Sequence, residues 1–273
     1  MYIDTHCHLS RDDYDDIDLV IKENINNQID KIIVSCCDKA SIIEGLAISL
    51  NYEDIFLTLG YHPSEANDIN ENDLLELEKY LKNESKVVGI GEIGLDYHYG
   101  KEDIDKQKWL FRKQLEIAQK LSLPVVIHSR DATLDTINIL MEYPGVKGDI
   151  HCFSGSIEIA EKYISMGYKL GIGGVVTFKN SNLYKVVETV GIDNIILETD
   201  SPYLTPEPFR GKKNSSKYIP YIAKKIAEIL SISVEEVGFR TSKNAINLFD
   251  LKWFLWYLKC NNKEGLEELI FWH

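Results

Sequence analysis

The sequence lacks the features that mark several specialised classes of protein. Its five cysteines are odd in number, and two of them, Cys36 and Cys37, are adjacent, so they form no framework of paired disulfides. No apolar run approaches membrane-spanning length, and the N-terminus has no basic segment followed by an apolar one. These absences predict a cytoplasmic protein with reduced thiols and no membrane partner.

Positive charge is also scarce, because 30 Lys and Arg residues face 43 Asp and Glu residues, for a net charge of -13. A protein that coats nucleic acid neutralises phosphates over a broad basic surface, and this balance argues against that mode. Any site that handles phosphate must therefore be local. The chain has 273 residues, 44% of them hydrophobic, which is enough for one large core.

Short apolar segments alternate with helical ones along the chain. A first strand over 1–9 and an acidic helix near 15–27 are followed by predicted strands at 31–36, 55–62, 87–95, 124–129, 148–153, 169–178 and 195–200. Helical spacing between strands is typified by Gln107, Phe111, Gln114, Ala118 and Leu121. This alternation predicts a parallel sheet, and about 250 residues fit a single-domain (β/α)8 TIM barrel. A doubly wound open sheet is the alternative.

The composition of the chain changes after residue 250, where the last barrel helices give way to a short tail rich in aromatic residues. Helices are predicted near 217–230 and 234–248, and Ser233 to Glu236 has the capping-box spacing that begins the second. We therefore assign 1–250 to the barrel domain and 251–273 to an aromatic-rich tail, which holds three of the four tryptophans. We interpret the tail as an amphipathic helix that packs on the barrel. An oligomer contact and a membrane-surface anchor are the alternatives.

The first strand carries the motif Asp-Thr-His-Cys-His. Because side chains alternate across a strand, we expect Asp4, His6 and His8 on one face. Two neutral imidazoles aimed at one point suit Zn, Mn, Fe or Ni, and harder cations become suitable when carboxylates join them. An isolated pair of this kind fits a polar strand end equally well, so the downstream residues decide.

Polar side chains recur where the other predicted strands end, and in a barrel these ends meet at one mouth. Each of these residues alone fits a structural role. Together, five of the seven histidines and two carboxylates predict a metal site. The set is His6, His8, His62, Glu92, His128, His151 and Asp200.

The number of ligands favours two ions over one, because four imidazoles and two carboxylates exceed what one four- or five-coordinate ion uses. Glu92 can bridge the pair. Two ions about 3.5 to 4 Å apart can activate a water and stabilise the attacking and leaving oxygens of a displacement at phosphorus. Asp4 and Glu198, two residues before His6 and Asp200, are either acceptors that orient ligands or polar filler of the barrel.

Cationic side chains follow three of the predicted strands, at Arg130, at Lys179 and at Arg210 to Lys213. Their placement after barrel strands favours contact with an anion over a purely solvated loop. The run Gly89 to Gly94 matches G-x-G-x-x-G, but Leu95 to Gly100 do not begin a helix that could receive a pyrophosphate. We interpret these glycines as allowing close packing of a strand around an inward carboxylate.

These motifs resemble the TatD family of metal-dependent deoxyribonucleases, within the amidohydrolase-like barrel superfamily. The resemblance covers about residues 1–250 and rests on many separate motifs in order. They are Asp4-Thr5-His6-Cys7-His8, Gly60-Tyr61-His62-Pro63, Gly91-Glu92-Ile93-Gly94-Leu95-Asp96, the run 124–130, His151-Cys152-Phe153-Ser154-Gly155 and Glu198-Thr199-Asp200-Ser201-Pro202.

The resemblance implies that divalent metal supports DNA hydrolysis, and with the number of ligands we expect two divalent ions, Mg or Mn in function, with Zn, Ni or Fe as alternatives for the bound metal. It implies the ligands His6, His8, Glu92, His128, His151 and Asp200. It places His62 and Arg130 near the bound phosphate, to which we add Arg210 as a substrate-binding residue. Asp200 would help to deprotonate or orient the attacking water, with Glu92 as its catalytic partner. The implied substrate is DNA, trimmed from the 3′ side at single-stranded or frayed ends.

Two departures from the family pattern stand out. After Arg210-Gly211-Lys212 the family usually continues with Asn-Glu-Pro, whereas this chain has Lys213 to Ser216, and the tail has no counterpart. Alternative functions are hydrolysis of small amides, lactones or phosphoesters, editing of misacylated tRNA, and a metal-binding scaffold. Many small-molecule hydrolases of this superfamily carry a carbamylated lysine where this chain has Glu92, which favours the nuclease. We expect no obligate protein partner.

Overall fold

A computed structural model describes residues 1–98, 100 and 103–251, so the predicted tail 251–273 lies outside the described residues except for Leu251, which is buried. Eight parallel strands form one sheet in the order of the chain, which confirms the predicted TIM barrel. The strands are β1 (Tyr2–Cys7), β2 (Ile29–Cys36), β3 (Ile55–Leu59), β4 (Val87–Asp96), β5 (Val125–Arg130), β6 (Gly148–Ile150), β7 (Lys169–Ile172) and β8 (Ile195–Leu197).

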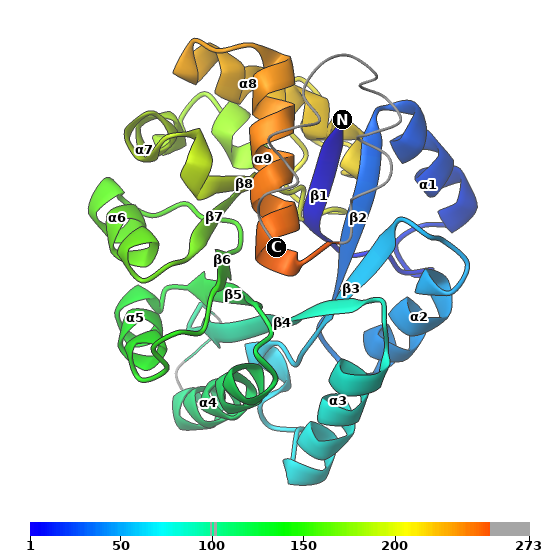
Figure 1. Ribbon diagram of the computed structural model, residues 1–273, viewed down its shortest axis with the longest axis vertical. Coiled ribbons are helices and arrows are strands. Elements are labelled where there is room, and N and C mark those ends of the chain that lie inside the picture. The colour runs from blue at the N-terminus through cyan, green and yellow to red at the C-terminus, as the bar shows by residue number, and fades with distance from the viewer. Residues whose placement is uncertain (99, 101–102, 252–273) are drawn as a thin grey trace, which may run out of the picture.

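Helices surround the strands, and α9 lies across them in Figure 1. The helices are α1 (Ile17–Asn26), α2 (Lys39–Ser49), α3 (Glu71–Asn83), α4 (Ile104–Leu121), α5 (Thr133–Met141), α6 (Ile157–Ser165), α7 (Leu183–Val190), α8 (Ile219–Leu230) and α9 (Val234–Phe249). The Ser233 hydroxyl accepts a hydrogen bond from the Glu236 N–H at 3.0 Å. This is the N-cap that the sequence predicts for the last helix.

The barrel closes where the chain following β8 meets β1. Cys7 and Ser201 form a parallel bridge, and the His8 N–H donates to the Ser201 carbonyl at 2.7 Å. The Asp200 N–H donates to the His6 carbonyl at 3.0 Å. Residues far apart in the sequence, near 6 and near 200, are therefore locked together by backbone hydrogen bonds.

Apolar residues fill both faces of the strands. In β5, Val125 and Ile127 belong to the layer between strands and helices, whereas Val126 belongs to a second cluster inside the barrel. This arrangement explains why the strands are continuously apolar rather than alternating.

The second cluster closes the amino-terminal end of the barrel. It joins one residue from each of four strands, β1, β2, β5 and β8, to the end of α9. We call it the barrel floor, and its members are Ile3, Ile33, Val126, Ile196, Ala245, Phe249 and Leu251. The carboxyl ends of the strands lie at the opposite end, which we call the mouth.

Several strands end earlier than predicted. The predicted strand 169–178 ends at Ile172, because Gly174–Thr177 forms a 3₁₀ helix. The strands predicted to reach 62, 153 and 200 end at Leu59, Ile150 and Leu197. Apolar side chains such as Val176 stay buried after the chain leaves the sheet, so apolar content alone does not reveal the last paired residue. His62, His151 and Asp200 consequently lie in loops just past the strands.

Candidate metal centre

Four of the predicted ligands surround one point at the mouth. The His6 Nε2 lies 3.5 Å from Glu92 Oε2 and 3.8 Å from Asp200 Oδ1. The His8 Nε2 lies 3.8 Å and 3.5 Å from the same two oxygens. These separations are longer than hydrogen bonds of about 2.9 Å. Two ligands that each lie about 2.1 Å from a shared ion are themselves about 3 to 4 Å apart, which matches this group.

A second group adjoins the first through the same carboxylate. The His151 Nε2 lies 3.7 Å and the His128 Nδ1 lies 2.7 Å from the other oxygen of Glu92, Oε1. Glu92 therefore directs one oxygen at His6 and His8 and the other at His128 and His151. This is the placement that a bridging carboxylate requires.

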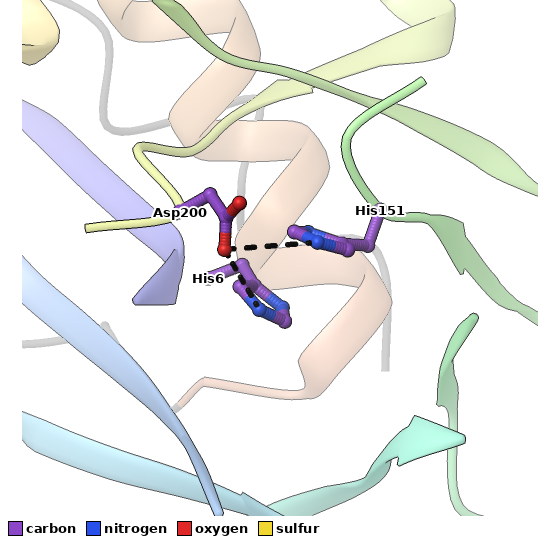
Figure 2. Close-up of side chains that lie close together, drawn as sticks. All are labelled: His6, His151 and Asp200. Atoms are coloured by element: carbon purple, nitrogen blue, oxygen red, sulfur yellow. Dashed lines mark ion pairs between the residues drawn. The ribbon is translucent and has the colours of Figure 1, made fainter. Parts of the chain in front are cut away.

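Figure 2 shows how closely the two groups approach. His6, His151 and Asp200 point toward one another from β1, from the loop after β6 and from the loop after β8. The rings of His6 and His151 stack with centroids 3.6 Å apart, and the His151 Nε2 lies 3.8 Å from Asp200 Oδ1. All six predicted ligands thus converge at the mouth.

His6 supplies a test of whether these residues suit a metal. Its side chain is fully buried, and neither ring nitrogen has a hydrogen-bond partner among the described residues. A buried polar nitrogen without a partner is costly, and coordination of a divalent cation would satisfy it. The donor set of imidazoles and carboxylates suits Zn, Mn, Fe or Ni, and the carboxylates also admit Mg.

Asp200 is held by its backbone neighbours. Its φ of +54° places it in the left-handed region, which a non-glycine residue adopts only when its surroundings fix it.

Asp4 accepts hydrogen bonds from the Thr199 N–H at 3.0 Å and the Thr199 hydroxyl at 2.6 Å. The register of β1 shifts between Asp4 and Cys7, so simple alternation does not hold there. Asp4 contacts the backbone beside Asp200 and the N–H of His6, rather than a ligand side chain.

Glu198, in contrast, contacts the side chain of a predicted ligand directly. Its Oε2 lies 3.2 Å from the His151 Nδ1, and its Oε1 accepts a hydrogen bond from the Cys152 N–H at 2.6 Å. A Cβ on Gly171 of β7 would lie only 2.3 Å from Glu198 Oε2. The glycine therefore makes room for the carboxylate that orients His151.

The glycine run of β4 serves the same kind of close packing. Gly94 has a φ of +147°, and a Cβ there would lie 1.9 Å from the His128 carbonyl oxygen. A Cβ on Gly91 would lie 2.6 Å from the Val126 Cβ. The strand continues through Asp96 and the next helix begins only at Ile104, so the run is not a dinucleotide-binding turn.

Two buried glutamines of α4 hold the ends of β3 and β4. Gln114 accepts from the Tyr61 N–H at 2.7 Å and donates to the Tyr61 carbonyl at 3.0 Å. Gln107 makes the matching pair with Asp96, at 2.9 Å in both directions. In the sequence both glutamines marked only the helical spacing and were not expected to contact the strands. Their place on the buried face of an amphipathic helix is the feature of the sequence that could have predicted buried hydrogen bonds from their amides.

Charge in the ligand groups is strongly coupled. Burial alone would raise the pKa of Glu92, but His151 and the other histidines hold it well below its usual range. Burial opposes a positive charge on His151, yet Glu198 and Glu92 raise its pKa to about 10. Burial and His151 together lower the pKa of His6. The ligand groups thus combine anionic carboxylates with two kinds of histidine, one protonated and one neutral.

The predicted substrate-binding residues take different positions. His62 is adjacent to the ligands, with its ring 4.6 Å from that of His128, and burial lowers its pKa to about 4. Arg130 ends β5 and pairs in register with Asp96 of β4. Arg210 lies elsewhere, with its guanidinium carbon 4.0 Å from the centre of the Phe178 ring. Among the described contacts it touches none of the six ligands.

The sequence matches the family model described as TatD related DNase over residues 3–250. The chain belongs to the TatD family. It is 42% identical to the metal-dependent hydrolase YabD of Bacillus subtilis, a match that covers 91% of this chain and 99% of YabD.

Solved structures of TatD proteins agree with this assignment. The Escherichia coli TatD homologue YjjV superposes with a TM-score of 0.84 at 29% identity, over 92% of this chain and 98% of YjjV. A TatD family hydrolase of Entamoeba histolytica superposes with a TM-score of 0.81 at 26% identity, over 91% and 97% of the two chains. This TatD-family chain is a metal-dependent hydrolase. Among its described residues no helix has the length and apolar character needed to cross a membrane.

Proposed function

We propose that the protein hydrolyses phosphodiester bonds of DNA with two divalent cations, Mg or Mn, and trims single-stranded or frayed ends from the 3′ side. The observation that carries the proposal is the orientation of Glu92. Its two oxygens face two different pairs of histidines, His6 with His8 and His128 with His151. Family membership supports a nucleic acid substrate.

The six ligands would hold the cations, which supply Lewis acidity that activates a water and neutralises charge developing at phosphorus. Asp200 lies within 3.8 Å of both His6 and His8, at the edge of the first group. Its carboxylate orients the attacking water and accepts its proton. Glu92, with one oxygen toward each pair of histidines, would hold both cations and offset their mutual repulsion.

His62 acts as a hydrogen-bond donor to the scissile phosphate. Its Nδ1 accepts a hydrogen bond from the Ser64 N–H at 3.2 Å, so a neutral ring carries its proton on Nε2. Burial keeps the ring neutral by lowering its pKa to about 4. A neutral donor binds a phosphate oxygen without competing with the cations for charge. Arg130 and Arg210 add local positive charge that attracts the DNA backbone to an otherwise acidic protein.

The decisive experiment is hydrolysis of single-stranded DNA labelled at either end. Protein stripped with chelator should be inactive, and Mg or Mn should restore cleavage. Loss of mononucleotides from the 3′ end would leave a ladder of 5′-labelled products. Bis(p-nitrophenyl) phosphate, a phosphodiester without nucleobases, serves as the matched small substrate. Its hydrolysis without cleavage of DNA would replace the proposed function by that of a small phosphoester hydrolase. Full activity in verified metal-free protein would contradict the metal site.

A further inference from the structure

We infer that Asp96 is a positioning residue. It holds His128 Nε2, the outer ring nitrogen that turns away from Glu92, and thereby aims Nδ1, the inner nitrogen beside Glu92, at the second cation. The inference rests on the proposed two-cation function and adds a residue that the ligand set does not contain. Asp96 ends β4 and is 8% exposed.

The His128 ring lies between two carboxylates. Its Nδ1 is 2.7 Å from Glu92 Oε1, and its Nε2 is 3.1 Å from Asp96 Oδ2. When one nitrogen of an imidazole binds a cation, the other carries a proton and needs an acceptor. With Nδ1 facing Glu92, the acceptor for the Nε2 proton is Asp96.

His151 has the same arrangement, which argues against coincidence. Its Nε2 faces Glu92 at 3.7 Å, and its Nδ1 faces Glu198 at 3.2 Å. Both histidines of the second group therefore have a carboxylate on the nitrogen that turns away from Glu92. In the first group, the outer nitrogen of His8 lies 3.3 Å from the Ser35 carbonyl, and the Cys37 thiol also contacts this ring, but among the described contacts no carboxylate holds that nitrogen. The second cation is thus the one supported by charged acceptors.

Asp96 is itself fixed, so it can fix another group. Its Oδ1 accepts a hydrogen bond from the His98 N–H at 2.9 Å, which leaves Oδ2 for His128. Gln107 of α4 binds both its backbone N–H and its carbonyl at 2.9 Å. A carboxylate with its backbone and one oxygen held in place can determine the tilt of the ring it binds.

The same residues permit a different occupant. His62, Asp96 and His128 each offer one ligand atom, and these atoms lie within 4.8 Å of one another, so a third cation could bind there. Two contacts favour the hydrogen bond. The Ser64 N–H already occupies His62 Nδ1, and the Asp96 oxygen is at hydrogen-bond distance from His128 Nε2. The third cation is therefore an outcome of the test and not part of the inference.

The test compares Asp96→Asn with a matched control, Asp131→Asn, in the absence of DNA. Asp131 is an exposed carboxylate near the mouth, 3.1 Å from His98 and outside the ligand groups. Zn or Mn is titrated into metal-free protein, and the number and affinity of bound ions are measured by calorimetry and native mass spectrometry. Asp96→Asn should weaken the second ion about 10- to 100-fold and change the first by no more than about threefold. The control should leave both affinities nearly unchanged.

A spectroscopic measurement on the unmodified protein covers the case in which Asp96→Asn fails to fold. Imidazole nitrogen NMR of the metal-loaded protein should show His128 with its proton on Nε2. A proton on Nδ1 would overturn the inference, as would unchanged affinities in Asp96→Asn. If the unmodified protein binds three ions and Asp96→Asn binds two, Asp96 is a metal ligand and the inference is wrong. The unmodified protein could also bind two ions, lose affinity for the second in Asp96→Asn, and yet leave DNA uncut. That result would support the inference and contradict the proposed function.

Discussion

The floor and the mouth are opposite ends of one barrel, and their chemistry is opposite. At the floor, apolar side chains such as Ile3, Ile33 and Val126 pack in one cluster with Phe249 from α9. At the mouth, imidazoles and carboxylates lie within 4 Å of one another. Packing and chemistry are therefore separated along the strands, and we expect a change at one end to have little effect on the other.

Beside the floor, β6 carries an unusual carboxyl group at the position that pairs with Val126. Asp149 of β6 is 1% exposed, and neither of its oxygens has a hydrogen-bond partner among the described residues. Burial, aided by the nearby charge of Glu198, raises its pKa well above the usual range. A neutral carboxyl group here adds no further negative charge beneath the predicted ligands, which already include the carboxylates of Glu92 and Asp200.

The largest effect should come from the mouth, at Glu92. Glu92→Gln keeps the shape of the side chain but removes the charge that can hold two cations. The variant should fold normally, bind fewer than two ions and lose at least about a thousandfold in kcat, because water activation and charge stabilisation fail together. Metal counting by mass spectrometry and DNA hydrolysis measure both effects.

Asp200→Asn is the matched comparison for Glu92→Gln. It should retain at least one ion on His6, His8 and Glu92, and its defect should lie mainly in kcat, because it loses the group that orients the water. A Glu92→Gln protein with two tightly bound ions and a near-normal rate would show that Glu92 is only structural.

The next largest effect should come from the floor and spare the mouth. Phe249→Ala removes a ring that is 2% exposed from the end of α9 and should lower the free energy of unfolding by about 3 to 5 kcal/mol. Phe239→Ala on the same helix, where the ring is 45% exposed, should cost about 1 kcal/mol or less. Denaturant unfolding measures both. If folded Phe249→Ala protein binds fewer ions, the two ends are not separable.

A smaller effect concerns protons at the mouth. Burial opposes protonation of both His128 and His151, but Asp96 and Glu92 raise the pKa of His128 to about 9, and Glu198 and Glu92 raise that of His151 to about 10. Both rings are therefore protonated near neutral pH before a cation binds. Each must lose a proton on coordination, so the apparent affinity should rise about tenfold per pH unit for each proton released.

Calorimetry in two buffers that differ in ionisation enthalpy counts these protons directly. The rise in affinity should level off as the pH passes about 9 to 10, where the rings have already lost their protons. Affinity that is independent of pH between about 6 and 8 would contradict the protonated pairs.

The smallest effect should come from the cationic loops. Arg130→Glu and Arg210→Glu should each raise the apparent KM for DNA several-fold at low salt, with the difference fading as salt screens the charge. Lys225→Glu makes the same charge change on the outer helix α8 and serves as the control. An equal effect of all three variants would mean that net charge, and no local contact, governs capture of the substrate.

Much of the mouth could be predicted because its residues mark strand ends in the sequence. His6, His8, His128 and Asp200 each stand at or just beyond an apolar segment, and barrel topology alone brings such positions together. The prediction was weaker at the exact ends of strands. His62 lies beyond β3 as the N-cap of a 3₁₀ helix, because hydrogen bonding and not apolar content ends a strand.

The residues that support the ligands were harder to foresee. Asp96 lies in a motif that identifies the family, but its partner His128 is 32 residues away and meets it only through the register of β4 and β5. Asp4 looked like a neighbour of His6 on one strand face, yet a shift in register gives it Thr199 instead. Such pairings depend on details of sheet geometry that spacing in one strand does not contain.

The paired glutamines of α4 have a consequence for how the sequence can vary. Gln107 and Gln114 are seven residues apart, close to two full turns, so both amides lie on one side of the helix. One residue inserted between them would rotate one amide by about 100° relative to the other. Either Tyr61 or Asp96 would then lose both of its backbone partners. The two pairs of backbone contacts therefore fix the length of the interval from 107 to 114.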